Sequence, residues 1–222
     1  MPDILNHIDR ISLNAVLPQV FANADIHPQS DVWQHDVNFE RGRLYLVEAN
    51  SGTGKSSLCS YIYGYRSDYE GTISFDSTDI KTLGVAEWTT MRLQCLSLLW
   101  QELRLFSELT AWENIAIKNQ LTHYQSENQI NQWFEALGIA DRKHTLVGRM
   151  SFGQQQRVAL IRALCQPFSF IFVDEPISHL DDTNSAIVGQ ILTDEAHRQG
   201  AAVVVTSIGK HMQLNYDKTL RL

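Results

Sequence analysis

The sequence lacks any long hydrophobic run. Its longest predominantly apolar stretches, such as residues 168–173 and 201–205, are far shorter than the roughly 20 residues that a membrane-spanning helix needs. A secretory leader is not predicted either, because Asp3, His7, Asp9 and Arg10 interrupt the amino-terminal segment. We therefore expect a cytoplasmic protein.

Cysteines are few and widely spaced. Cys59, Cys95 and Cys165 form neither a CxxC metal pattern nor an even-numbered disulfide framework. Cys59 and Cys165 fall within helical patterns, where we expect small buried thiols.

Positive charge and linker sequence are also scarce. The formal net charge is −7, which disfavours nucleic-acid binding, because such proteins normally present a basic face. There are no repeats, low-complexity tracts or Pro/Gly-rich linkers. With 222 residues, of which 44% are hydrophobic and 19% charged, we expect one domain, residues 1–222, with a buried core.

Three short apolar runs, at residues 44–47, 168–173 and 203–206, each lead into a polar turn. Such runs, separated by helical stretches, predict an α/β fold with a parallel sheet core and helices on both faces. Ligands in these sheets bind beyond the carboxyl ends of the strands. Residues 11–16 and 71–75 alternate and predict an amino-terminal antiparallel subdomain. Residues 102–150 are rich in helix formers and predict an inserted helical lobe, with Gly138 ending one helix.

The strongest local motif follows the first apolar run. Residues 49–56 read A-N-S-G-T-G-K-S, which matches the phosphate-loop pattern G-x-x-x-x-G-K-[ST] except at Ala49. The glycines let backbone N–H groups converge on phosphate oxygens at a helix start. Lys55 would reach the outer phosphates, and the Ser56 hydroxyl would bind Mg²⁺. The predicted nucleotide-binding residues are Asn50, Ser51, Gly52, Thr53, Gly54, Lys55, Ser56 and Ser57.

An acidic pair ends the second apolar run. Asp174, at the end of a buried strand beside the phosphate loop, can hold Mg²⁺, and Glu175 can polarise the attacking water. Taken alone, the pair would be read as a solvated turn. Beside a phosphate loop the catalytic interpretation is favoured, and this region resembles a Walker B strand.

Residues 150–157, M-S-F-G-Q-Q-Q-R, lie between these two motifs. They resemble the LSGGQ signature of ATP-binding cassette (ABC) ATPases, and the resemblance extends over nearly the whole chain. In that family the signature contacts ATP held by a partner cassette. The resemblance therefore implies that Ser151, Gly153 and Gln154 bind that nucleotide at a helix start. Phe152 replaces the first signature glycine, and its side chain could crowd the approach to phosphate.

Other positions carry the same resemblance. Gln101 is similar to the Q-loop glutamine, which in the family senses Mg²⁺ and the attacking water and hinges the helical lobe. An exposed helix-start glutamine is the alternative. Residues 178–181 resemble the D-loop of the dimer interface, where His179 is interpreted as an interface residue rather than a catalytic one.

Two positions depart from the pattern or are ambiguous. Ser207 stands where the family places a γ-phosphate-binding histidine, and serine reaches less far and cannot carry positive charge; His211 could compensate. We expect Ser207 to slow hydrolysis more than it weakens ATP binding. For the aromatic residue that stacks on adenine we predict Phe21, with packing in the core nearly as favoured. Trp33 is the rival, and we expect it to pack in the core.

The resemblance implies an ATPase that binds ATP and Mg²⁺, dimerises with a second cassette and drives an integral membrane permease, attached to the inner face of the membrane through that permease. It is similar to cassettes of the lipoprotein-release, macrolide-export and cell-division type. The alternative is an ATP-gated regulatory or structural subunit with weak turnover, which Phe152 and Ser207 favour. A soluble phosphotransferase is disfavoured by the signature, and a DNA-repair ABC protein by the absence of long insertions.

Overall fold

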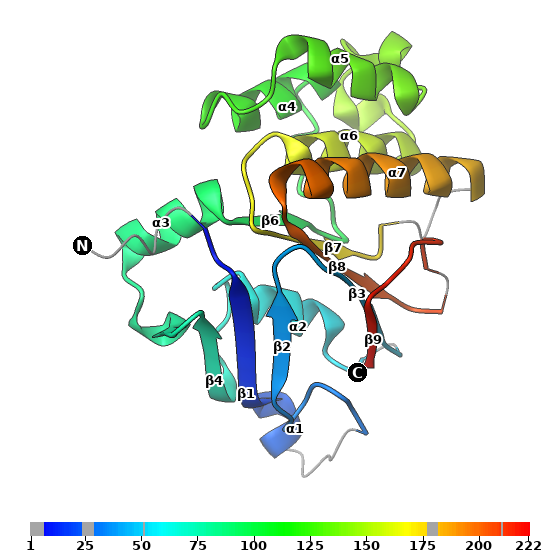
Figure 1. The fold of residues 1–222 in the computed structure, drawn as a ribbon. Helices are drawn as coiled ribbons and strands as arrows, with labels where there is room; N and C mark the ends of the chain where they lie inside the picture. Colours follow the sequence, from blue (N-terminus) through cyan, green and yellow to red (C-terminus); the bar gives the residue numbers. More distant parts are fainter. Residues whose placement is uncertain (1–6, 24–28, 51, 177–181, 210) are drawn as a thin grey trace.

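The structure is a computed structural model that describes residues 7–23, 29–50, 52–176, 182–209 and 211–222 (Figure 1). Its central parallel sheet has the strand order β6-β7-β8-β3-β9. The strands are β3 (Leu44–Glu48), β6 (Leu96–Leu99), β7 (Phe170–Asp174), β8 (Ala202–Ser207) and β9 (Lys218–Arg221). The three predicted apolar runs are the three central strands, and their pairing is parallel as expected. The two edge strands were not predicted.

The second sheet is antiparallel, in the order β2-β1-β4-β5. It consists of β1 (Arg10–Pro18), β2 (Val37–Glu40), β4 (Tyr69–Phe75) and β5 (Thr78–Asp79). The predicted alternation of residues 11–16 and 71–75 is confirmed, with Ile11 opposite Phe75 and Leu13 opposite Ile73.

The helices are α1 (Gln19–Asn23), α2 (Lys55–Ile62), α3 (Val85–Gln94), α4 (Ala111–Gln120), α5 (Glu127–Ala136), α6 (Phe152–Leu164) and α7 (Asp182–Gln199). The predicted helical region at residues 102–150 contains α4 and α5, which Figure 1 shows beyond α6 and α7, on the side away from the antiparallel sheet. Thr110 caps α4 in a capping box with Glu113. Gly138 has a φ of +63° just after α5, so it ends that helix as predicted.

Alternate residues of the central strands enter two different cores. Phe170, Phe172 and Val204 face α2 and the antiparallel sheet. Ile171, Val173 and Val205 face the layer formed by α4, α5, α6 and α7. Because both faces are covered, these strands are apolar throughout, and their polar turns stay at the edge of the sheet.

The three cysteines are free and buried, as was expected for Cys59 and Cys165. Burial raises the pKa of each thiol, that of Cys95 to about 11, so these residues are packing groups rather than nucleophiles. Cys165 follows α6 rather than lying within it. In the described part of the chain, none of the helices combines the length and apolar character needed to cross a membrane.

Candidate active site

The phosphate loop joins β3 to α2. The Ala49 N–H donates to the Ser207 carbonyl at 3.0 Å, which ties the start of the loop to the end of β8. Gly52 and Gly54 have φ values of +83° and +96°, a region that side chains rarely adopt. Helix α2 begins at Lys55, directly after Gly54. Ser51 lies outside the described residues.

Two aromatic rings pack against the end of this loop. A methyl group added at Gly54 would lie 3.0 Å from the Trp33 ring and 3.4 Å from the Phe21 ring. Trp33 is buried, as expected, and its indole Nε1 donates to the Thr53 carbonyl at 2.8 Å. Phe21 is 8% exposed in the middle of α1 and belongs to the buried core. Its role in stacking on adenine stays a prediction.

The acidic pair meets the phosphate loop at the carboxyl ends of β3 and β7. Asp174 Oδ2 accepts a hydrogen bond from the Ser56 hydroxyl at 2.9 Å, and Asp174 Oδ1 lies 3.9 Å from Lys55 Nζ. Lys55 also forms an ion pair with Glu175. Lys55 and Asp174 are 8% and 2% exposed, so water screens this cluster little.

Gln101 completes the cluster from the end of β6. Its amide Nε2 donates to Glu175 Oε2 at 3.2 Å. Glu175 has a φ of +50°, an uncommon conformation for a residue with a side chain, and its N–H donates to the Thr206 carbonyl at 3.1 Å. Strain of this kind is often found where a catalytic side chain must leave the end of a strand in one direction. The structure thus gathers Lys55, Ser56, Gln101, Asp174 and Glu175, as the sequence predicted.

A family model described as "ABC transporter" matches residues 33–178. The chain belongs to the ABC transporter family. It is therefore an ATP-binding cassette and an ATPase, which converts ATP and water to ADP and phosphate.

Two curated relatives place it among ATP-binding proteins of this family. The chain is 32% identical over 171 residues to the lipoprotein-releasing system ATP-binding protein LolD of Koribacter versatilis, covering 75% of this chain and 76% of LolD. It is 28% identical over 200 residues to the macrolide export ATP-binding/permease protein MacB of Aggregatibacter actinomycetemcomitans. That match covers 89% of this chain but only 30% of MacB.

The fold is that of solved cassettes. The ABC transporter cassette MJ0796, solved as a dimer, matches with a TM-score of 0.72 and 24% identity over 89% of this chain and 87% of MJ0796. The parallel sheet, the antiparallel sheet and the helices therefore form the cassette fold, as the sequence predicted.

The signature segment lies at the start of α6. Ser151 caps the helix, with its hydroxyl accepting from the Gln154 N–H at 3.3 Å while Gln154 Oε1 accepts from the Ser151 N–H at 3.0 Å. Phe152 is 43% exposed on the first turn. A role for Ser151, Gly153 and Gln154 in a partner's site stays a prediction, and the D-loop positions 178–181 lie outside the described residues.

Ser207 ends β8 beside the phosphate loop, opposite Glu48 in the strand register, and is only 3% exposed. His211 lies 4.0 Å from Glu48 and packs its ring edge against Tyr216. These contacts are on the Glu48 side of the loop, so whether His211 compensates for Ser207 stays untested.

Sequence reasoning missed one site residue, Thr206, and one contact of Trp33. The Thr206 hydroxyl donates to Asp174 Oδ1, so Asp174 is held by Ser56 and Thr206 together. Trp33 was considered as the rival adenine-stacking residue and expected to pack in the core, but its hydrogen bond to the phosphate loop was not predicted. A threonine within a strand and a tryptophan before one give no sequence signal for such long-range hydrogen bonds.

Substituting Trp33→Phe should weaken ATP binding about threefold to tenfold, because the ring remains but the hydrogen bond to Thr53 is lost. Titration of the purified cassette with Mg²⁺-ADP measures this effect. The control is Trp112→Phe on α4, whose ring contacts Lys143. Equal affinities for Trp33→Phe and the native cassette would show that this bond does not order the loop.

Proposed function

We propose that this cassette hydrolyses Mg²⁺-ATP as part of a dimer and drives an integral membrane permease from its cytoplasmic face. We take residues 1–222 as one cassette domain with a helical lobe at about residues 102–150. The observation that carries the proposal is the convergence of Lys55, Ser56, Asp174, Glu175 and Gln101 at one edge of the parallel sheet.

Each member of this cluster has a distinct task. Lys55 is paired with carboxylates in this structure, and the outer phosphates of ATP would replace those carboxylates as its ionic partners. Glu175 would orient the attacking water and accept its proton. Gln101, which donates to Glu175, would hold that carboxylate and the water in line. Ser207 is proposed as a single hydrogen-bond donor near the γ-phosphate.

The cluster also fits Mg²⁺. Magnesium prefers oxygen ligands and is usually bound through one or two protein groups together with phosphates and water. The Ser56 hydroxyl and the Asp174 carboxylate lie 2.9 Å apart, and the Gln101 amide oxygen would be a further ligand. When bound, the ion would neutralise charge that develops on the phosphates.

Dimer formation is supported by the exposed signature. The start of α6 presents backbone N–H groups and the Ser151 hydroxyl on the surface, a suitable arrangement for a phosphate. That phosphate would belong to ATP held by a second cassette. The signature of the second cassette would in turn contact the ATP held by this chain.

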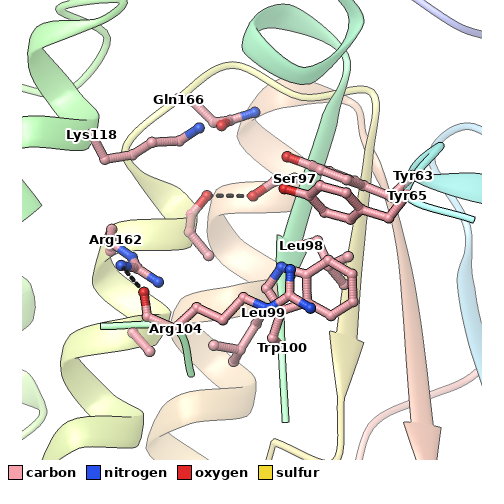
Figure 2. A pocket seen from close by; sticks show the side chains of 12 residues that line it. Tyr63, Tyr65, Ser97, Leu98, Leu99, Trp100, Arg104, Lys118, Arg162 and Gln166 are labelled. Carbon is pink, nitrogen blue, oxygen red and sulfur yellow. Dashed lines mark hydrogen bonds between the residues drawn. The ribbon is translucent and has the colours of Figure 1, made fainter. Parts of the chain in front are cut away.

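A cavity of about 190 Å³ lined by Trp100 and Arg104 suits a protein partner (Figure 2). It is smaller than the roughly 300–1,000 Å³ of typical small-molecule sites, so it would hold side chains of a docked segment. Lys118 lines it and has no ion-pair or hydrogen-bond partner in the part of the chain that the structure describes. Exposed apolar residues lie nearby on the same elements: Tyr65, Ile117 and Leu121.

These features support docking of a cytoplasmic permease segment that carries an acidic residue. The name of MacB, "Macrolide export ATP-binding/permease protein", supports a permease as the partner. Burial and the nearby Arg162 lower the pKa of Lys118, which an incoming carboxylate would reverse.

The test is co-expression with the membrane proteins encoded beside this gene, purification through a tag on the cassette, and measurement of ATP hydrolysis. Lys118→Glu should abolish most of the permease-dependent stimulation, because it repels the incoming carboxylate, while hydrolysis by the isolated cassette stays unchanged. Lys218→Glu, an exposed lysine on β9, makes the same charge change elsewhere and should keep the stimulation. Loss of stimulation in both variants, or in neither, would contradict docking at this cavity.

A further inference from the structure

The chain makes an unusual turn directly after Gln101. Leu103 and Arg104 have φ values of +59° and +50°, so two consecutive residues with side chains adopt the left-handed conformation that favours glycine. Short local bonds accompany the turn, with the Leu103 N–H donating to the Trp100 carbonyl at 3.0 Å. Such a backbone persists only where the surrounding structure holds it.

Arg162 of α6 holds this turn. Its Nη2 donates to the Leu103 carbonyl at 2.6 Å and its Nη1 to the Arg104 carbonyl at 2.7 Å. Figure 2 shows the Arg162 side chain reaching from α6 to the carbonyl oxygen of Arg104. The planar guanidinium presents its donors in a fixed fork, so it binds two adjacent carbonyls only when the turn has one particular shape.

The position of Arg162 is electrostatically unfavourable. Burial lowers the pKa of its guanidinium, and within the described residues it forms no ion pair with a carboxylate. Lys118 lines the same cavity and adds a like charge. The hydrogen bonds to the two carbonyls are therefore what compensates this half-buried cation, so its charge depends on the shape of the turn.

The turn is also anchored through the Arg104 side chain. Its guanidinium stacks 3.7 Å from the centre of the Trp100 ring. This contact fixes the Arg104 side chain but does not bind the carbonyls of Leu103 and Arg104, which accept from Arg162. The Arg162 fork is therefore the contact that fixes the backbone.

Gln101 depends on this backbone. Gln101 is exposed, and its side-chain amide donates a hydrogen bond to Glu175 Oε2 at 3.2 Å. It lies between the last residue of β6, Leu99, and the turn at Leu103. A relaxed turn would redirect residue 101 and move the amide out of reach of Glu175.

We propose that Arg162 is a positioning residue for ATP hydrolysis: by binding the carbonyls of Leu103 and Arg104, it keeps the Gln101 amide on Glu175. The inference rests on the catalytic role proposed above for Gln101. Because Arg162 lies on α6, the helix that Ser151 caps, it also links the signature helix to Gln101.

Arg162→Lys is the first test, because lysine keeps the charge and loses the fork. We expect kcat to fall about 10- to 100-fold, as expected for a small misplacement of a catalytic group, while KM for ATP changes less than about twofold. Arg41→Lys is the matched control, since Arg41 also donates to two consecutive carbonyls, those of Gln199 and Gly200, away from Gln101. It should leave kcat unchanged.

A double-mutant cycle separates the proposal from the role of Gln101. If Arg162 acts through Gln101, Arg162→Lys should change kcat less than about twofold in a Gln101→Ala background. An equal fall in both backgrounds would overturn the proposal. If Gln101→Ala alone leaves kcat unchanged, the proposed role of Gln101 is wrong, and the inference about Arg162 falls with it.

Folding is checked by thermal melting and Mg²⁺-ADP binding. Should Arg162→Lys fail to fold, Arg162→Gln takes its place in the same cycle, because its amide reaches one carbonyl and carries no charge. A parallel rise in KM and fall in kcat would indicate general disruption and would count against a positioning role.

Discussion

Substituting Glu175→Gln is expected to reduce ATP turnover about 10²- to 10⁴-fold, because glutamine cannot accept the proton of the attacking water. ATP binding should persist, since Lys55, Ser56 and Asp174 still face the phosphates. The amide can still accept from Gln101, so the local geometry is retained. Steady-state phosphate release measures the rate, and equilibrium titration measures the binding.

The same variant should trap the dimer. Without hydrolysis, ATP held between two cassettes is not consumed, so light scattering should show a dimer with Mg²⁺-ATP and a monomer with ADP. Glu135→Gln, an exposed position on α5, is the control and should turn over ATP normally. A Glu175→Gln cassette that hydrolyses ATP at the native rate would remove Glu175 from the mechanism.

Substituting Ser207→His is expected to raise turnover, by up to about 10²-fold, because a preorganised donor near the developing charge contributes that much in other enzymes. Ser207 ends β8 beside the phosphate loop, where a longer cationic side chain would reach toward the γ-phosphate. ATP affinity should change less than the rate. Turnover is measured for the cassette alone and with its membrane partner.

Ile208→His is the matched control. It places an imidazole at the next residue, whose side chain is 42% exposed. Since Ser207 is buried, melting temperatures must accompany the rates. An unchanged rate in a folded Ser207→His cassette would show that serine does not limit hydrolysis. Native turnover near zero, with or without the partner, would instead support a regulatory subunit.

Much of the site was predictable because it depends on local chemistry. Gly54, Lys55 and Ser56 stand in a fixed spacing that only a strand-loop-helix arrangement uses, and Asp174 ends a run that is apolar on both faces. Parallel strands carry their polar ends to one edge, so the meeting of Lys55 with Asp174 and Glu175 followed from the pattern. The antiparallel strands at residues 11–16 and 71–75 and the helical region at residues 102–150 were likewise predictable from their residue patterns.

Other features could not be predicted, since they depend on which distant elements pack together. β6 and β9 are edge strands that form by pairing with distant strands of the parallel sheet. The bonds of Thr206 to Asp174 and of Trp33 to Thr53 join residues whose sequence patterns describe only a strand and a core position.

The sequence by itself determined the family, the phosphate loop, the acidic pair and the two departures at Phe152 and Ser207, because these are properties of residue type and spacing. Only the tertiary structure decided how Gln101 is held. The left-handed turn at Leu103 and Arg104 contains no glycine, so the sequence does not predict it. Arg162, some sixty positions later in the chain, binds both of its carbonyls and holds it. A strained backbone of this kind is specified by its surroundings rather than by its own residues.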